Sequence, residues 1–104
     1  GVLLLNTILT VEEGRPMSHA NIGWEQLCYE AVRALDERGG VVFCLWGAAA
    51  QNYKGAVRSS PVVCSAHPSP LSSGAKNPFR GSRPFTRINE ELKKLGLEPI
   101  DWKL

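Results

Sequence analysis

Residues 62–72 constrain the fold more than any other stretch of the chain. Residues 62–66 are small or β-branched and mostly apolar, a composition that favours a buried strand. His67 follows, and Pro68 and Pro70 then prevent a strand or helix from continuing, because proline has no N–H donor and restricts the residue before it. The stretch therefore predicts a strand that ends at a histidine and leads into a stiff loop.

Two earlier apolar runs, residues 2–5 and 41–46, also predict strands that are covered on both faces. Between them a helix is expected to start at Trp24 and to end at the glycine pair that begins with Gly39. Its apolar residues recur at helical spacing and predict a single buried face. These residues are Trp24, Leu27, Cys28, Ala31 and Leu35.

After the second strand, Gly47 permits a tight turn into a short helix that starts at Ala48. Residues 73–83 are rich in glycine, serine, proline and basic residues and predict a loop. A last helix is expected from Pro84, and residues 99–102 are expected to pack back on the body. The apolar face of this last helix consists of Phe85, Ile88, Leu92 and Leu95.

The alternation of strands and helices predicts an α/β fold, with a parallel sheet, flanking helices and right-handed crossovers. Open parallel sheets bind ligands outside the carboxyl ends of their strands. In this chain those ends carry Asn6, Gly47 with Ala48, and His67. The pattern alone therefore nominates these positions as a candidate site.

The composition sets limits on function. The 104 residues amount to one small domain, and 43% hydrophobic with 21% charged residues is typical of a folded globular protein. A net charge of +2 permits a nucleic-acid partner without indicating one. The three cysteines are widely spaced, so we expect reduced thiols in an intracellular protein, with no metal and no cofactor. No apolar run approaches the roughly 18 residues of a membrane span, so no membrane partner is expected.

The motif His67-Pro-Ser-Pro-Leu-Ser72 resembles the leucine-loop signature of the family 1 uracil-DNA glycosylases. Residues 1–7, 23–26, 45–47 and 99–102 match other motifs of that family in the family's order. The resemblance covers residues 1–104 but only the C-terminal part of a single three-layer α/β/α domain. We therefore expect that the chain has lost an N-terminal segment. The Trp-Gly-Ala order at 46–48 and a longer loop after residue 72 lean toward herpesvirus-type members.

The resemblance gives His67 and Asn6 roles at the base. His67 would act as a neutral electrophile that stabilises negative charge on the departing uracil, and Asn6 would read the pyrimidine. Its carboxamide can accept from uracil N3–H and donate to O4, whereas cytosine presents the reverse pattern. The plainer interpretation of Asn6 is a strand-end residue that closes a turn, and His19 is interpreted as structural.

The resemblance makes Leu71 a wedge that fills the gap left by a flipped nucleotide. The plainer interpretation is a loop leucine that folds back on the core. Phosphate contacts would come from serine hydroxyls and from the backbone N–H groups at Ala48, where family members often have serine. The implied DNA-binding residues are Ala48, Pro68, Ser69, Pro70, Leu71 and Ser72. Contacts by Lys76 or Arg80 stay open, because the longer loop departs from the commonest family pattern.

Family members also use a water-activating aspartate, and neither Asp36 nor Asp101 has its sequence context. The leading hypothesis is therefore the recognition half of an enzyme that hydrolyses the N-glycosidic bond of deoxyuridine in base-excision repair. It implies two partners, uracil-containing DNA and the missing segment that carries the aspartate. It also implies a nuclear location, in the host nucleus for a viral protein. The alternatives are a non-catalytic module that binds DNA or a replication protein, and an unrelated half of a doubly wound domain.

Overall fold

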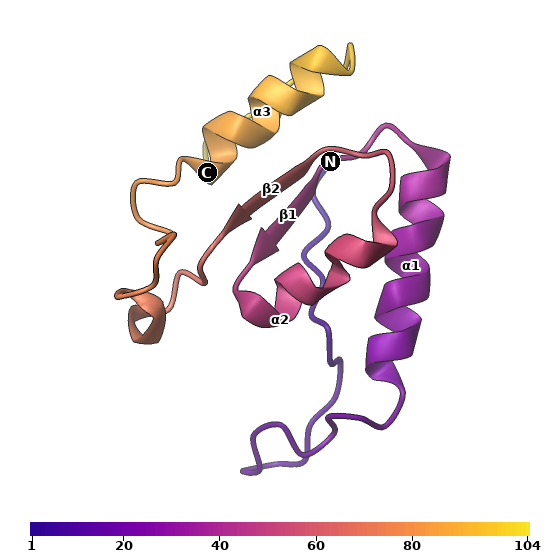
Figure 1. The fold of residues 1–104 in the computed structure, drawn as a ribbon, viewed down its shortest axis with the longest axis vertical. Helices are drawn as coiled ribbons and strands as arrows, with labels where there is room; N and C mark the ends of the chain where they lie inside the picture. The colour runs from indigo at the N-terminus through magenta and orange to yellow at the C-terminus, as the bar shows by residue number, and fades with distance from the viewer.

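The core of the fold is a parallel sheet of two strands, β1 (Phe43–Trp46) and β2 (Val62–Ser65), in a computed structural model that describes residues 1–104 (Figure 1). Cys44 pairs with Val63, so the carboxyl ends of both strands lie at the same edge of the sheet. The expected strands at 41–46 and 62–66 are confirmed with slightly shorter bounds. The predicted α/β class is confirmed as well.

The expected strand at residues 2–5 is wrong. Residues 1–10 form neither helix nor strand, and Leu3 and Leu4 are 72% and 85% exposed. A strand that is apolar on both faces becomes stable when neighbouring layers cover those faces, since burial must offset the entropy lost on ordering. No layer of this chain covers residues 2–5, so the apolar run stays extended and exposed.

One layer consists of helix α1 (Trp24–Arg38), which packs on the 3-10 helix η1 (Asn52–Ala56). Their shared core contains Cys28, Val32, Tyr53 and Ala56. The expected helix is confirmed, and it ends at Gly39 (φ 76°), whose N–H donates to the carbonyl of Leu35. The predicted face is partly wrong, because α1 buries Val32 and Asp36 next to Cys28, whereas Leu27 is 55% exposed.

On the other side of the sheet lies helix α3 (Pro84–Lys94), as Figure 1 shows. Ile88 and Leu92 pack against Val63 of β2, as the pattern predicts, but Phe85 and Leu95 stay exposed. The tail after α3 completes this layer, with Ile100 and Trp102 packed against its core. The expected packing of residues 99–102 is confirmed by Ile100, which exchanges two hydrogen bonds with the Asn89 amide at 2.8 and 2.9 Å. None of the helices has both the length and the apolar character that crossing a membrane requires.

Candidate functional site

The site is built at the edge where β1 and β2 end. The ladder continues beyond the strands, because the N–H of Gly47 donates to the carbonyl of Ser65 at 2.9 Å. Gly47 then starts the short helix α2 (Ala48–Gln51), and the Gln51 side chain donates to the same Ser65 carbonyl at 3.0 Å. Ser65 is fully buried. Gly47 and the Gln51 side chain thus both bind the carbonyl of Ser65, two residues before His67.

Sequence reasoning missed the positioning roles of Ser65 and Gln51. The available signals were weak: a small polar residue in an apolar strand, and a glutamine after three alanines. Both signals are common in proteins, and only the fold brings the two residues together. Ala48 begins α2 with an exposed side chain, as expected for the first residue of the predicted helix.

His67 is exposed beyond the end of β2, and its ring has one hydrogen bond. The backbone N–H of Ser69 donates to Nδ1 at 3.0 Å, so a neutral ring carries its proton on Nε2. Pro68 has no N–H, which makes the amide of Ser69 the first donor that follows the histidine. No residue of the chain bonds Nε2. The loop therefore presents His67 as a donor that faces outward.

The loop after His67 displays Leu71. Ser69 caps a 3-10 turn, η2 (Pro70–Ser72), and its Oγ accepts from the N–H of Leu71 at 3.3 Å. The carbonyl of Ser69 also accepts from the N–H of Ser72 at 3.0 Å. Leu71 is 98% exposed, so the interpretation in which it folds back on the core is wrong. Leu71 is thus an exposed apolar side chain on a turn that two hydrogen bonds to Ser69 hold in place. A wedge that enters DNA requires such an arrangement.

Asn6 lines a hollow of which His67 is not a part. The hollow is open, measures about 730 Å³ and lies between the N-terminal segment, α1 and the start of η1. Ala49 of α2 lines the same hollow, and α2 begins at Gly47 beside His67. No hydrogen bond holds the Asn6 carboxamide, and no strand ends at this residue, so it does not close a strand-end turn. These residues place Asn6 at a cavity but leave its carboxamide orientation unset.

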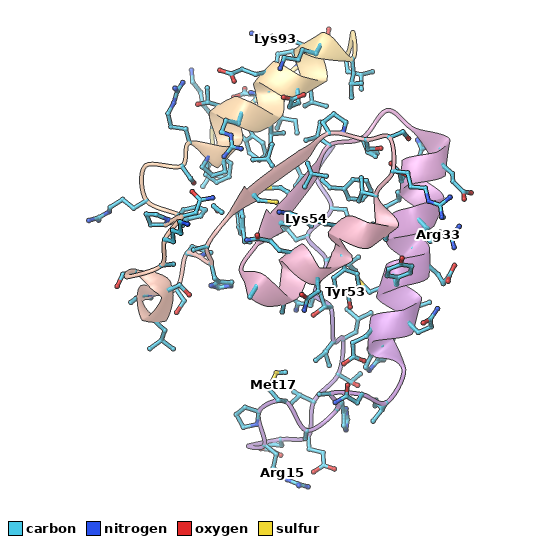
Figure 2. All side chains as sticks on the ribbon, viewed as in Figure 1. Arg15, Met17, Arg33, Tyr53, Lys54 and Lys93 are labelled. Carbon is cyan, nitrogen blue, oxygen red and sulfur yellow. The ribbon has the colours of Figure 1, made fainter.

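Glu25 and Tyr53 give the hollow its electrostatic character. The Glu25 carboxylate accepts from the N–H of Asn21 at 2.9 Å, and this hydrogen bond lowers the pKa of Glu25. Burial raises the pKa of Tyr53, which keeps its hydroxyl protonated at neutral pH. Figure 2 shows Tyr53 between η1 and α1. The hollow therefore combines an ionised carboxylate with a phenol that donates toward the Glu25 carbonyl at 3.5 Å.

The comparisons with known proteins agree with this geometry. A sequence model of the uracil DNA glycosylase superfamily matches residues 1–93. The chain belongs to this superfamily. Uracil-DNA glycosylases from Lacticaseibacillus casei and Limosilactobacillus reuteri are each 53% identical to it, over 100% of this chain and 46% of theirs. The Bacillus licheniformis relative is 50% identical over 100% of this chain and 47% of its own length. The chain thus spans about half the length of these relatives.

The chain also has the fold of solved uracil-DNA glycosylase structures. Two crystal structures of mimivirus UNG variants in complex with UGI superpose on it with TM-scores of 0.67 and 0.63, at 28% sequence identity. Each match covers 78% of this chain and 36% of the other chain. The likeness therefore extends from the motifs to the arrangement of the elements. The herpesvirus-type lean stays a prediction.

Neither of the two aspartates of the chain, Asp36 and Asp101, lies at this site. The Asp36 carboxylate is buried, and it accepts from the backbone N–H groups of Arg58, Ser59 and Ser60 at 2.8, 3.2 and 2.8 Å. These hydrogen bonds, led by that of Arg58, hold the pKa of Asp36 well below its usual range. Asp101 is exposed in the tail and accepts from the Lys103 N–H. Both aspartates are structural, as their sequence contexts indicate.

His19 also has a structural role, as predicted. Its Nδ1 lies 2.7 Å from Thr10 Oγ1, and the same hydroxyl oxygen accepts from Trp24 Nε1 at 2.7 Å. This chain of bonds ties the loop before α1 to the first residue of the helix. His19 therefore organises a loop and is separate from the edge that holds His67.

Proposed function

We propose that this chain is the recognition and wedge portion of a uracil-DNA glycosylase. The whole protein would flip deoxyuridine out of DNA and hydrolyse the bond between uracil N1 and deoxyribose C1′. The observation that carries the proposal is the Ser69–His67 hydrogen bond, which leaves Nε2–H as an outward donor four residues before the exposed Leu71. Family membership supports the same activity.

The outward Nε2–H supports a defined part for His67 in the proposed reaction. When the glycosidic bond breaks, its electron pair leaves with uracil and negative charge develops at O2. Nε2–H of His67 would donate to that oxygen, and one positioned donor of this kind contributes about 3–4 kcal/mol to the transition state. Water adds at C1′, and its proton passes to a base that residues 1–104 do not provide at this edge.

Two partners follow from the proposal. Uracil-containing DNA would take Leu71 into the vacated stack while Ser69 and Ser72 meet phosphates. A further segment of the whole protein would supply the water-activating carboxylate and would fix the orientation of the Asn6 carboxamide. The greater length of the relatives supports this second partner.

The test is uracil release by the whole protein and its His67→Leu variant. We expect the variant to lose about 100-fold or more in turnover with little change in affinity for DNA, because the donor acts on charge present near the transition state. Equal losses in affinity and rate would make His67 a structural residue. A whole protein that binds DNA without releasing uracil would instead favour the non-catalytic module. The structural roles of Asp36 and Asp101 favour that module, because neither aspartate is available to activate water.

The nuclear location stays a prediction, as does contact with a replication protein. Imaging of the tagged whole protein in its own cells would test the first, and co-purification with the replication machinery would test the second.

A further inference from the structure

The Ser65 carbonyl has one hydrogen-bond donor more than the sheet requires. The N–H of Gly47 continues the ladder between β1 and β2 and is enough to satisfy this buried carbonyl. The Gln51 side chain nevertheless donates to the same oxygen through Nε2 at 3.0 Å, in a partly buried position. Holding a glutamine side chain in one conformation costs entropy. The second hydrogen bond therefore does more than complete the sheet.

Gln51, Gly47 and Ser65 form a closed ring of hydrogen bonds. The backbone N–H of Gln51 donates to the Gly47 carbonyl at 3.0 Å, and both residues donate to the Ser65 carbonyl. Gln51 is the last residue of the four-residue helix α2, which starts just beyond the tip of β1 in Figure 1. A helix this short has little stability of its own. The ring of hydrogen bonds therefore fixes α2 to the end of β2.

The peptide group between Ser65 and Ala66 is held from two directions. Its carbonyl accepts from Gln51, and its N–H, which belongs to Ala66, donates to the Asn77 carbonyl at 2.8 Å. A trans peptide group has its C=O and N–H on opposite sides, so rotation of the group would break both bonds. The next carbonyl, that of Ala66, accepts from Ser65 Oγ at 3.0 Å. The backbone that leads into His67 is thus fixed by bonds to other elements.

Arg87 holds the preceding carbonyl more loosely. Its Nη1 donates to the carbonyl of Cys64 at 3.4 Å and to that of Ser82 at 3.5 Å. Hydrogen bonds from N–H groups to oxygen are usually about 2.7–3.2 Å long, so both bonds are weak. Gln51 makes a shorter bond than Arg87, and it binds a carbonyl that is nearer to His67 in the chain. Among the side chains of other elements that reach the end of β2, Gln51 therefore has the stronger hold.

We propose that Gln51 is a positioning residue that fixes His67 for the reaction. This inference deepens the proposed function, on which it rests. The Gln51 bond fixes the peptide group two residues before His67, and Gly47, which bonds the same carbonyl, lies beside the histidine. The one hydrogen bond of the His67 ring comes from its own loop, so the direction of Nε2–H depends on the backbone that carries the ring. Gln51 thus acts on the rate through His67 and not by contact with uracil.

The experiment compares the whole protein with its Gln51→Met variant, which keeps the length of the side chain but cannot donate. In single-turnover assays on single-stranded uracil DNA, the rate should fall about tenfold, less than the roughly 100-fold that a misplacement of about 1 Å can cost. Affinity for the same DNA should stay nearly unchanged, because the lost geometry matters near the transition state. The NMR signals of the His67 ring nitrogens should shift or broaden in the variant.

Asn89→Leu is the matched control. The Asn89 amide donates to the Ile100 carbonyl at 2.9 Å in a partly buried position on α3. This variant therefore also removes a bond between a side-chain amide and a backbone carbonyl, but it leaves the edge that carries His67 intact. It should lower the unfolding temperature without changing the rate per folded molecule or the His67 signals.

Gln51→Glu separates donation from packing. An ionised carboxylate cannot donate to the Ser65 carbonyl, whereas a protonated carboxyl group can. The loss of rate relative to the wild type should therefore shrink as the pH falls from about 7 toward about 5, where the carboxyl group beside a carbonyl gains its proton. The loss in Gln51→Met should not depend on pH.

The NMR comparison needs no uracil. It decides the role of Gln51 even for a whole protein that releases no uracil, a result that would refute the proposed function alone. If Gln51→Met does not fold, the pH dependence of Gln51→Glu decides instead, in the rate or in the His67 signals relative to the wild type. An unchanged rate and unchanged His67 signals in folded Gln51→Met would overturn the proposal, as would equal changes in Asn89→Leu or a loss in Gln51→Glu that is independent of pH.

Discussion

Gly47 and His67 lie so close together that a side chain at Gly47 would require His67 to shift by a few tenths of an ångström. A Cβ added to Gly47 would lie 3.3 Å from Cβ and 3.8 Å from Cδ2 of His67. Gly47 also has φ at 91°, a conformation that residues with a side chain rarely adopt. The tight turn between β1 and α2 thus limits the position of His67 from across the sheet edge.

Gly47→Ala should therefore lower uracil release by the whole protein. A misplacement of about 1 Å can reduce a rate by roughly 100-fold, so a shift of a few tenths of an ångström should reduce it by less than that, and DNA affinity should change less still. Single-turnover assays on single-stranded uracil DNA measure the effect. Gly55→Ala is the control, since nothing lies within 4 Å of a Cβ at Gly55. Loss of stability in Gly47→Ala without loss of rate per folded molecule would contradict the positioning role.

The Ser69 N–H should determine the tautomer of His67. Ser69→Ala keeps this N–H, whereas Ser69→Pro removes it at a backbone φ of −56° that proline tolerates. Nitrogen NMR of the His67 ring should show the Nε2–H form in the wild type and in Ser69→Ala, and a mixture of both tautomers in Ser69→Pro. The same mixture in the wild type would show that the 3.0 Å bond does not control the proton.

Much of this geometry could be predicted from the sequence because it is local. Proline spacing predicts the loop after His67, and the apolar runs predict β1 and β2. The failures at residues 2–5 and at Leu27 have a common cause: periodicity finds apolar faces but not what covers them. The Nδ1–Ser69 bond and the Gly47–His67 contact depend on backbone positions that only the folded chain determines.

Leu71→Ala should weaken activity of the whole protein more on duplex than on single-stranded substrate. A vacated stack exists only in the duplex, and extruding a paired base costs a few kcal/mol. Stability should change by less than about 0.5 kcal/mol, because the side chain is almost fully exposed. Leu95→Ala, another exposed leucine, is the control. Equal losses on both substrates would assign Leu71 a role other than the wedge.

Asp36 should make the stability of the protein sensitive to acid. Its pKa is lower in the folded chain than in the unfolded chain, because three backbone N–H groups donate to the carboxylate. Its contribution is therefore complete above about pH 4 and is lost as the pH falls further. Asp36→Asn should lower the unfolding temperature by roughly 5 °C or more at pH 7 and reduce its fall in acid. Asp101→Asn should do neither, and similar curves for both variants would refute this assignment.

The 104 residues by themselves should release no detectable uracil. In the proposed function His67 would stabilise the departing base, but the structure brings no carboxylate to its edge that could activate water. Asn6 has no hydrogen bond that orients its amide, and the exposed Leu3 and Leu4 leave an apolar surface that invites association with other chains. A release assay on single-stranded uracil DNA would test this, with the 104-residue chain beside the whole protein at equal concentration. Robust release by the chain alone would show that one of its own residues activates water, and Glu25 in the hollow beside Asn6 would be the first to replace.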